Sequence, residues 1–248
     1  MNANPSPRSV AAPGTSHNVD AGELDKFATL AHQWWDPESP MFGALHKMNP
    51  LRLDWIDRQG GGLAGKRVVD VGCGGGILTE AIAARGAATL GIDLGDKGLS
   101  VARLHKLESG TTAEYRLIAA EALAREIPGA FDIVTCMEIL EHVPDPAGII
   151  AACGALARPG GTLVVSTIGR NLRSYALAVV AAEYILGLLP KGTHDYAKFL
   201  PPAEVASFAR RAGLLPVAIT GMTYNPFTKA FRLVGDTSVN YMMAFRRE

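Results

Sequence analysis

Residues 67–76 read RVVDVGCGGG, an apolar run that ends in a cluster of glycines. The apolar part is typical of a buried strand, and the pattern after the glycines predicts a helix, so the glycines form the turn between the two. Glycine permits positive φ and close approach of a ligand, and helix amides attract negative groups. The spacing is D-x-G-x-G-x-G, which does not meet the dinucleotide pattern G-x-G-x-x-G. The turn is a candidate ligand site, and a tight turn without a ligand is the alternative.

A second feature of this candidate site is Asp93, which ends the next predicted strand, 21 residues after Gly72. A carboxylate in this place can accept hydrogen bonds from both ribose hydroxyls of a nucleotide-like cofactor. On its own, Asp93 could equally be a capping residue. Together with the glycines it predicts a cofactor site at the carboxyl edge of a sheet.

Outward from this turn, strands and helices alternate along the chain. Alternation at this spacing predicts an α/β fold with a mostly parallel sheet and helices on both faces. The predicted strands are 67–72, 89–94, 114–118, 131–137 and 162–167, with further candidates at 214–219 and 240–245. The predicted helices are 20–33, one that Asn49-Pro50 opens, 77–86, 99–110 and 202–213.

The chain divides into three predicted parts. Residues 1–18 form a flexible tail, residues 19–65 a helical cap, and residues 66–248 the main domain with an apolar insertion at 172–198. Within that insertion, the apolar stretch 175–189 is only 15 residues long and contains a glutamate. A spanning helix needs about 20 apolar residues, so we expect that this stretch does not cross a membrane.

Composition narrows the class of protein. With 48% hydrophobic residues the chain has enough apolar surface to fold, which excludes global disorder. The 24 basic and 24 acidic residues give a formal net charge of zero, which argues against a nucleic-acid partner. Three cysteines without metal-finger spacing indicate reduced thiols, and no secretory signal precedes them, so we expect a cytoplasmic protein.

Two further residues are candidates for cofactor contact. Met137 ends the predicted strand 131–137, at the edge of the sheet where a bound cofactor would pass, although a core methionine is the alternative. Arg52 lies on the predicted helix after Asn49-Pro50. If that helix folds over the cleft, the guanidinium can bind a cofactor carboxylate; otherwise Arg52 is a solvated surface charge.

Glu138, Glu141 and His142 follow the same strand directly. If this segment is helical, the three side chains share one face. Two carboxylates and an imidazole could then hold a divalent cation. Alternatively, His142 could act as the general base for a phenol, whose usual pKa is about 10. A helix start with acidic residues and a structural histidine is the third interpretation.

Taken in order, the motifs of this chain resemble those of the ubiquinone biosynthesis O-methyltransferases, a class I S-adenosylmethionine (SAM) methyltransferase family with a Rossmann-like fold. The absence of G-x-S-x-G and of Asn-Pro-Pro-Tyr also favours small-molecule methylation over other chemistries. The resemblance runs from about Asn18 to the C-terminus. It is carried by Asn18-Val19-Asp20, Trp34-Trp35-Asp36, Asn49-Pro50-Leu51-Arg52, DVGCGGGIL, TCMEILEHVPDP, Glu183-Tyr184-Ile185-Leu186, Pro190-Lys191-Gly192-Thr193-His194-Asp195, Tyr224-Asn225-Pro226 and Val239-Asn240-Tyr241-Met242.

The resemblance implies a set of site residues and substrates. It implies SAM contacts at Arg52, Gly72, Asp93 and Met137. It implies methylation of two hydroxyls, on a 2-polyprenyl-6-hydroxyphenol and on a 3-demethylubiquinol. It also implies a divalent cation such as Mg²⁺ at an E-x-x-E-H pattern, which corresponds here to the cluster at 138–142. Many family members carry asparagine where this chain has Gly169, so a polar contact there is not expected.

A polyprenylated substrate gives the stretch 175–189 a possible role. The stretch is apolar nearly all round, and such a helix is either buried or faces lipid. We expect it to lie in the membrane interface and place the protein at the inner face of the membrane, where other ubiquinone-biosynthesis enzymes are possible partners. Burial in the core and a dimer contact are the alternatives. Two rival functions stay open: methylation of another small acceptor, and a non-catalytic SAM-binding scaffold.

Overall fold

The computed structural model describes residues 18–40, 42–169, 199–225, 228 and 230–248. The predicted tail, except Asn18, and the insertion with its apolar stretch lie outside these residues. The described part contains an eight-stranded sheet in the order β3-β2-β1-β4-β5-β8-β6-β7. Its strands are β1 (Arg67–Val71), β2 (Ala88–Asp93), β3 (Glu114–Leu117), β4 (Phe131–Met137), β5 (Ala157–Ile168), β6 (Leu214–Asn225), β7 (Ala230–Val234) and β8 (Asn240–Arg247).

The sheet has a parallel part and an antiparallel part. Strands β1 to β5 pair in parallel, which confirms the predicted α/β fold. Strand β8 is antiparallel to β5 and to β6, and β7 is antiparallel to β6. Strand β7 was not predicted, because residues 230–234 carry a charged residue and no clear alternation.

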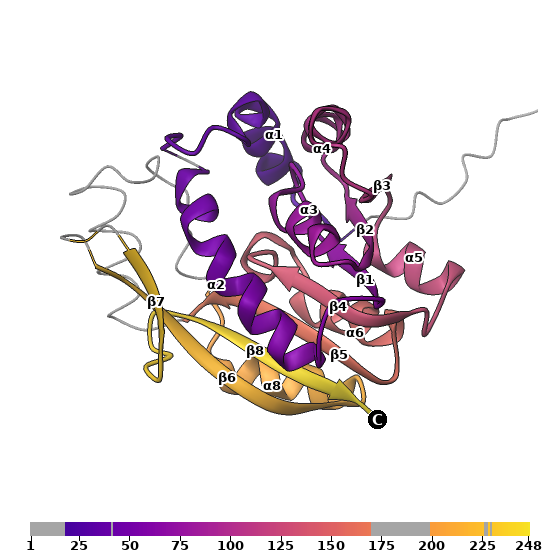
Figure 1. Cartoon of the computed structure of the whole chain (residues 1–248). Coiled ribbons are helices and arrows are strands. Elements are labelled where there is room, and N and C mark those ends of the chain that lie inside the picture. The colour runs from indigo at the N-terminus through magenta and orange to yellow at the C-terminus, as the bar shows by residue number, and fades with distance from the viewer. Residues whose placement is uncertain (1–17, 41, 170–198, 226–227, 229) are drawn as a thin grey trace, which may run out of the picture.

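Helices cover both faces of the sheet, as Figure 1 shows. Helices α2 (Gly43–Gly60), α3 (Ile77–Ala84) and α4 (Asp96–Ser109) lie on one face. Helices α5 (Ala120–Glu126), α6 (Pro146–Leu156) and α8 (Pro202–Arg211) lie on the other. One apolar cluster lies between the sheet and the helices on each face. Burial of the apolar side chains in these two clusters is the main stabilising contribution.

Three helices differ from the sequence-based prediction. Helix α2 begins at Gly43 and contains Pro50, so the proline lies inside the helix and does not open it. Helix α5 was not predicted because it is short. Helix α6 was missed because it is apolar all round, although its start is well marked: Asp145 caps it by accepting a hydrogen bond from the Gly148 amide at 3.0 Å.

The N-terminal region precedes the sheet, and its first helix and turn pack against α4. Helix α1 (Ala21–Thr29) is followed by a 3-10 turn at Ala31–Gln33. Before α1, the Asn18 side chain donates to the Asp145 carbonyl oxygen at 2.6 Å and accepts from the Asp145 amide at 2.8 Å. These bonds fix the start of the described chain beside the cap of α6.

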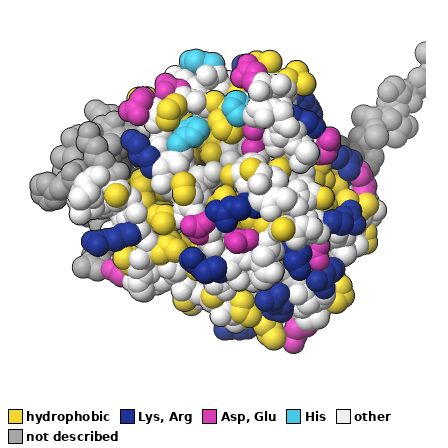
Figure 2. Space-filling model, in the orientation of Figure 1, with side chains coloured by type: hydrophobic (Ala, Val, Ile, Leu, Met, Phe, Trp, Pro, Cys, Tyr) yellow, Lys and Arg dark blue, Asp and Glu magenta, His cyan; other side chains and the backbone are white. Residues whose placement is uncertain are grey.

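Basic and acidic side chains are interspersed on the face that Figure 2 shows. Among the residues that the structure describes, no helix has the length and apolar character needed to cross a bilayer.

Candidate active site

The glycine turn between β1 and α3 adopts a backbone that requires glycine at alternate positions. Gly72, Gly74 and Gly76 have φ of 72°, 51° and 88°, a region that side-chain-bearing residues rarely adopt. The turn is fixed to β2 by the Gly72 amide, which donates to the Ile92 carbonyl oxygen at 2.8 Å. The D-x-G-x-G-x-G spacing therefore corresponds to three residues with left-handed backbone conformation in one turn.

Asp93 lies at the carboxyl end of β2 and contacts this turn directly. One carboxylate oxygen accepts from the Gly74 amide at 2.8 Å, and the other accepts from the Gly95 amide at 2.6 Å. Burial raises the pKa of Asp93. The structure thus brings together the two features from which the sequence predicted a cofactor site, and each oxygen keeps capacity for a further hydrogen bond.

A second buried acid, Asp70, lies beneath the turn at the end of β1. Its two oxygens accept hydrogen bonds from the hydroxyls of Thr79 and Thr135, both at 2.7 Å. Burial raises the pKa of Asp70 to about 6. The sequence marked Asp70 only as the first residue of the glycine motif and assigned it no role, although an acid inside an apolar strand was a signal.

Arg52 is buried on α2 and points toward the carboxyl ends of β4 and β5. Its Nη2 donates to the Glu138 carboxylate at 2.5 Å, and the Ser166 hydroxyl donates to the same oxygen at 2.8 Å. The Nε of Arg52 is buried and has no hydrogen-bond partner among the described residues. The interpretation of Arg52 as a solvated charge is therefore wrong, and its unpartnered donor suits an anionic ligand.

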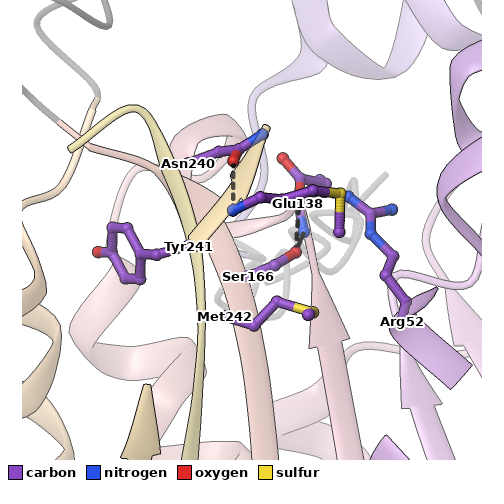
Figure 3. Close-up of a pocket in the computed structure, with 7 residues that line it drawn as sticks. Arg52, Glu138, Ser166, Asn240, Tyr241 and Met242 are labelled. Atoms are coloured by element: carbon purple, nitrogen blue, oxygen red, sulfur yellow. Dashed lines mark hydrogen bonds and ion pairs between the residues drawn. The ribbon is translucent and has the colours of Figure 1, made fainter. Parts of the chain in front are cut away.

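Glu138 is held in an unusual conformation. It is the only described residue other than glycine with a positive φ, 55°. Its amide donates to the Ser166 carbonyl oxygen at 3.1 Å, which ties the residue to β5. Such strain is retained where surrounding contacts enforce it, and it is common at functional sites. Figure 3 shows the small cavity lined by Arg52, Glu138, Ser166, Met222, Asn240, Tyr241 and Met242.

The E-x-x-E-H cluster does not share one helical face, so that prediction is wrong. The 3-10 helix starts only at Leu140, after the positive φ of Glu138. Buried Glu141 accepts from the Thr167 hydroxyl at 2.7 Å, and His142 Nδ1 lies 2.8 Å from a Glu23 carboxylate oxygen on α1. Burial, and then the charge of Glu138, raises the pKa of Glu141.

These contacts direct His142 toward α1, whereas the carboxyl groups of Glu138 and Glu141 lie close to each other. Within the described ranges, no three His, Cys, Asp or Glu side chains are grouped so that they could hold a metal ion. The residues therefore do not fit a divalent cation in this arrangement.

Met137 is buried at the carboxyl end of β4, opposite Ser166 of β5. It belongs to the apolar cluster that α2 covers, together with Ile133 and Met242. Gly72, Asp93, Met137 and Arg52 thus all lie at or over the carboxyl edge of the parallel strands, which is where open α/β sheets bind ligands.

This fold, with its glycine turn and paired strand-end acid, defines a class I SAM-dependent methyltransferase. The chain matches the family described as "Methyltransferase domain" over residues 44–219. Among curated proteins, it is 62% identical over 231 residues to the ubiquinone biosynthesis O-methyltransferase of Thiobacillus denitrificans, covering 93% of this chain and 99% of that protein. The corresponding protein of Cupriavidus pinatubonensis is 61% identical over 241 residues, with 97% and 96% covered. The chain belongs to the ubiquinone biosynthesis O-methyltransferase family.

Solved structures agree on the fold. The magnesium protoporphyrin IX methyltransferase of Synechocystis PCC 6803 with bound S-adenosylhomocysteine (SAH) superposes with a TM-score of 0.66 at 19% identity, covering 92% of this chain and 95% of that one. A protein of Pyrococcus horikoshii OT3 superposes with a TM-score of 0.63 at 14% identity, with 90% and 99% covered.

Proposed function

We propose that this protein transfers the methyl group of SAM to phenolic hydroxyls of polyprenylated ubiquinone precursors, a 2-polyprenyl-6-hydroxyphenol and a 3-demethylubiquinol. The observation that carries the proposal is the convergence of the glycine turn, Asp93 and buried Arg52 at one edge of the sheet, in a chain of this family. When bound, SAM supplies an electrophilic methyl group on a sulfonium.

Within this proposal, four residues contact the cofactor. Asp93 accepts hydrogen bonds from the ribose hydroxyls, and the backbone at Gly72 lets the cofactor approach the turn. Arg52 binds the cofactor carboxylate, for which its buried and unpartnered Nε is a suitable donor. Met137 forms an apolar wall at the end of β4.

The chemical step in this proposal is an in-line transfer from the sulfonium to a phenolate oxygen. The protein contributes alignment of the two reactants, which supplies much of the rate gain. His142 acts as the general base that takes the phenol proton, and the Glu23 carboxylate at its Nδ1 orients the ring. We derive no step through a divalent cation at Glu138, Glu141 and His142.

We also propose that residues 19–65 form a cap over the cofactor cleft of the methyltransferase domain at 66–248. Helix α2 supports this, because it brings Arg52 to the strand ends. We further propose that the protein works in the cytoplasm at the inner face of the membrane. The support for that placement is the apolar sequence 175–189 and a lipid-soluble substrate.

The experiment that tests the proposal is methylation of a short-tailed demethylubiquinol by the purified protein with SAM, under reducing conditions. Parallel reactions contain chelator or added Mg²⁺. We expect formation of the methyl ether, with loss of most of the rate in His142→Gln. If chelator abolishes turnover, a metal ion and not His142 assists deprotonation of the phenol. SAM binding without turnover would favour another acceptor or a scaffold.

A further inference from the structure

Trp34, which follows the 3-10 turn after α1, lies directly on the glycine turn. A Cβ atom placed on Gly74 would be 2.3 Å from Cη2 of the indole, and one placed on Gly75 would be 2.5 Å from its Cγ. Contacts this short are impossible for a side-chain-bearing residue. The absence of side chains at these two positions is therefore what allows the indole to cover the turn.

The indole is held in place from its other side. The Phe42 ring stacks on it with centroids 4.0 Å apart and planes inclined by 20°. His46, from the first turn of α2, donates from Nε2 to the Trp34 carbonyl oxygen at 2.8 Å. Trp34 is thus a fixed part of the wall around the turn.

Its indole N–H is nevertheless unused. Nε1 of Trp34 is buried and has no hydrogen-bond partner among the described residues. The neighbouring Trp35 shows the usual outcome, since its Nε1 donates to the Gly75 carbonyl oxygen at 2.9 Å while its ring stacks on His105. A buried donor without a partner destabilises the folded protein, so such groups call for a specific explanation.

We propose that Trp34 is a further cofactor-binding residue, whose Nε1–H donates a hydrogen bond to an acceptor atom of bound SAM or SAH. Both molecules carry acceptors in their carboxylate, ribose and adenine, and the indole lies on the turn that forms their proposed site. Trp35 then has a different role: it anchors the segment to the protein. The inference rests on the proposed cofactor site and does not depend on the identity of the acceptor substrate.

The test compares Trp34→Phe with Trp35→Phe, each measured for SAH binding by calorimetry and for thermal unfolding with and without SAH. Phenylalanine keeps a ring against the turn and Phe42 but removes the N–H. One hydrogen bond contributes about 0.5–1.5 kcal/mol, so we expect the Kd for SAH to rise about 2- to 13-fold in Trp34→Phe. Its melting temperature without SAH should fall less than that of Trp35→Phe, since both variants lose ring packing but only Trp35→Phe also loses a hydrogen bond within the protein. Trp35→Phe should lower that melting temperature.

Several results would overturn the inference. An SAH affinity in Trp34→Phe within twofold of the unchanged protein would do so. A fall in its ligand-free melting temperature as large as that of Trp35→Phe, with unchanged SAH affinity, would assign the N–H to a partner within the protein or to water. Failure of the unchanged protein to bind SAH would refute the proposed cofactor site itself, a result distinguishable from the other two.

Discussion

Replacing Asp70 with asparagine should change how the stability of the protein depends on pH. The carboxyl group of Asp70 is buried, and its pKa in the folded protein is about 6, against an ordinary value of 3.8. Between these values the folded state binds more protons than the unfolded state. The free energy of unfolding must therefore fall as pH rises through this window, and asparagine removes that dependence because it does not titrate.

The size of the effect follows from the raised pKa. A rise from 3.8 to about 6 corresponds to about 3 kcal/mol at 1.36 kcal/mol per unit. About 1.4 kcal/mol of this contribution to the free energy of unfolding is lost between pH 5 and pH 8. Urea unfolding of both proteins at pH 5, 6, 7 and 8 measures it. The difference in unfolding free energy, unchanged protein minus Asp70→Asn, should be larger at pH 5 than at pH 8 by that amount.

A difference that stays constant over this pH range would refute the reasoning, since Asp70 would then be ionised throughout. Thr135→Val is a second check. The Thr135 hydroxyl donates to Asp70 and lowers its pKa, so its removal should raise that pKa further and steepen the fall in stability. A flatter profile in this variant would contradict the assigned hydrogen bond.

Three further outcomes are expected. Gly74→Ala should destabilise the protein by about 1–3 kcal/mol in urea unfolding and weaken SAH binding, because Gly74 has a φ of 51° and the added Cβ would overlap Trp34. A near-neutral free energy of unfolding would contradict the packing described. Tyr241→Phe should cost about 1–2 kcal/mol, since its buried hydroxyl donates to the Leu200 carbonyl oxygen at 2.7 Å, and an unchanged unfolding midpoint would exclude that bond. Arg52→Lys should raise the Kd for SAH about tenfold in calorimetry, because lysine lacks the forked donors of the guanidinium. Equal affinity would show that the guanidinium does not contact the ligand.

Much of the sheet could be predicted because buried parallel strands are short apolar runs bounded by glycine or charge. The strand predicted at 131–137 is β4, and the glycine turn after β1 lies where its pattern placed it. Antiparallel pairing of β8 could not be predicted, because it depends on contacts far apart in the sequence. The start of α2 was misplaced because a proline is favoured in a first turn, whereas Pro50 here lies well inside the helix.

The candidate site was only partly visible in the sequence. The contact between Asp93 and the glycine turn could be predicted, because the carboxyl ends of neighbouring parallel strands lie at the same edge of the sheet. The positive φ of Glu138 had no such signal, since a glutamate after a strand normally continues into extended or helical backbone. The ion pair of Glu138 with Arg52 and the hydrogen bond between His142 and Glu23 depend on how α1 and α2 pack, which residue spacing does not determine.

The position of β8 between β5 and β6 has a consequence for the order in which the molecule assembles. Strands β6 and β7 are close in sequence and can pair early, with Gly221 opposite Val234, as a local hairpin does. Their route to the rest of the sheet runs through β8, which pairs with β5 across more than seventy residues of chain. Long-range pairings of this kind form slowly. Until β8 inserts, the hairpin and the parallel strands are separate units, and insertion of that one strand is expected to limit the folding rate.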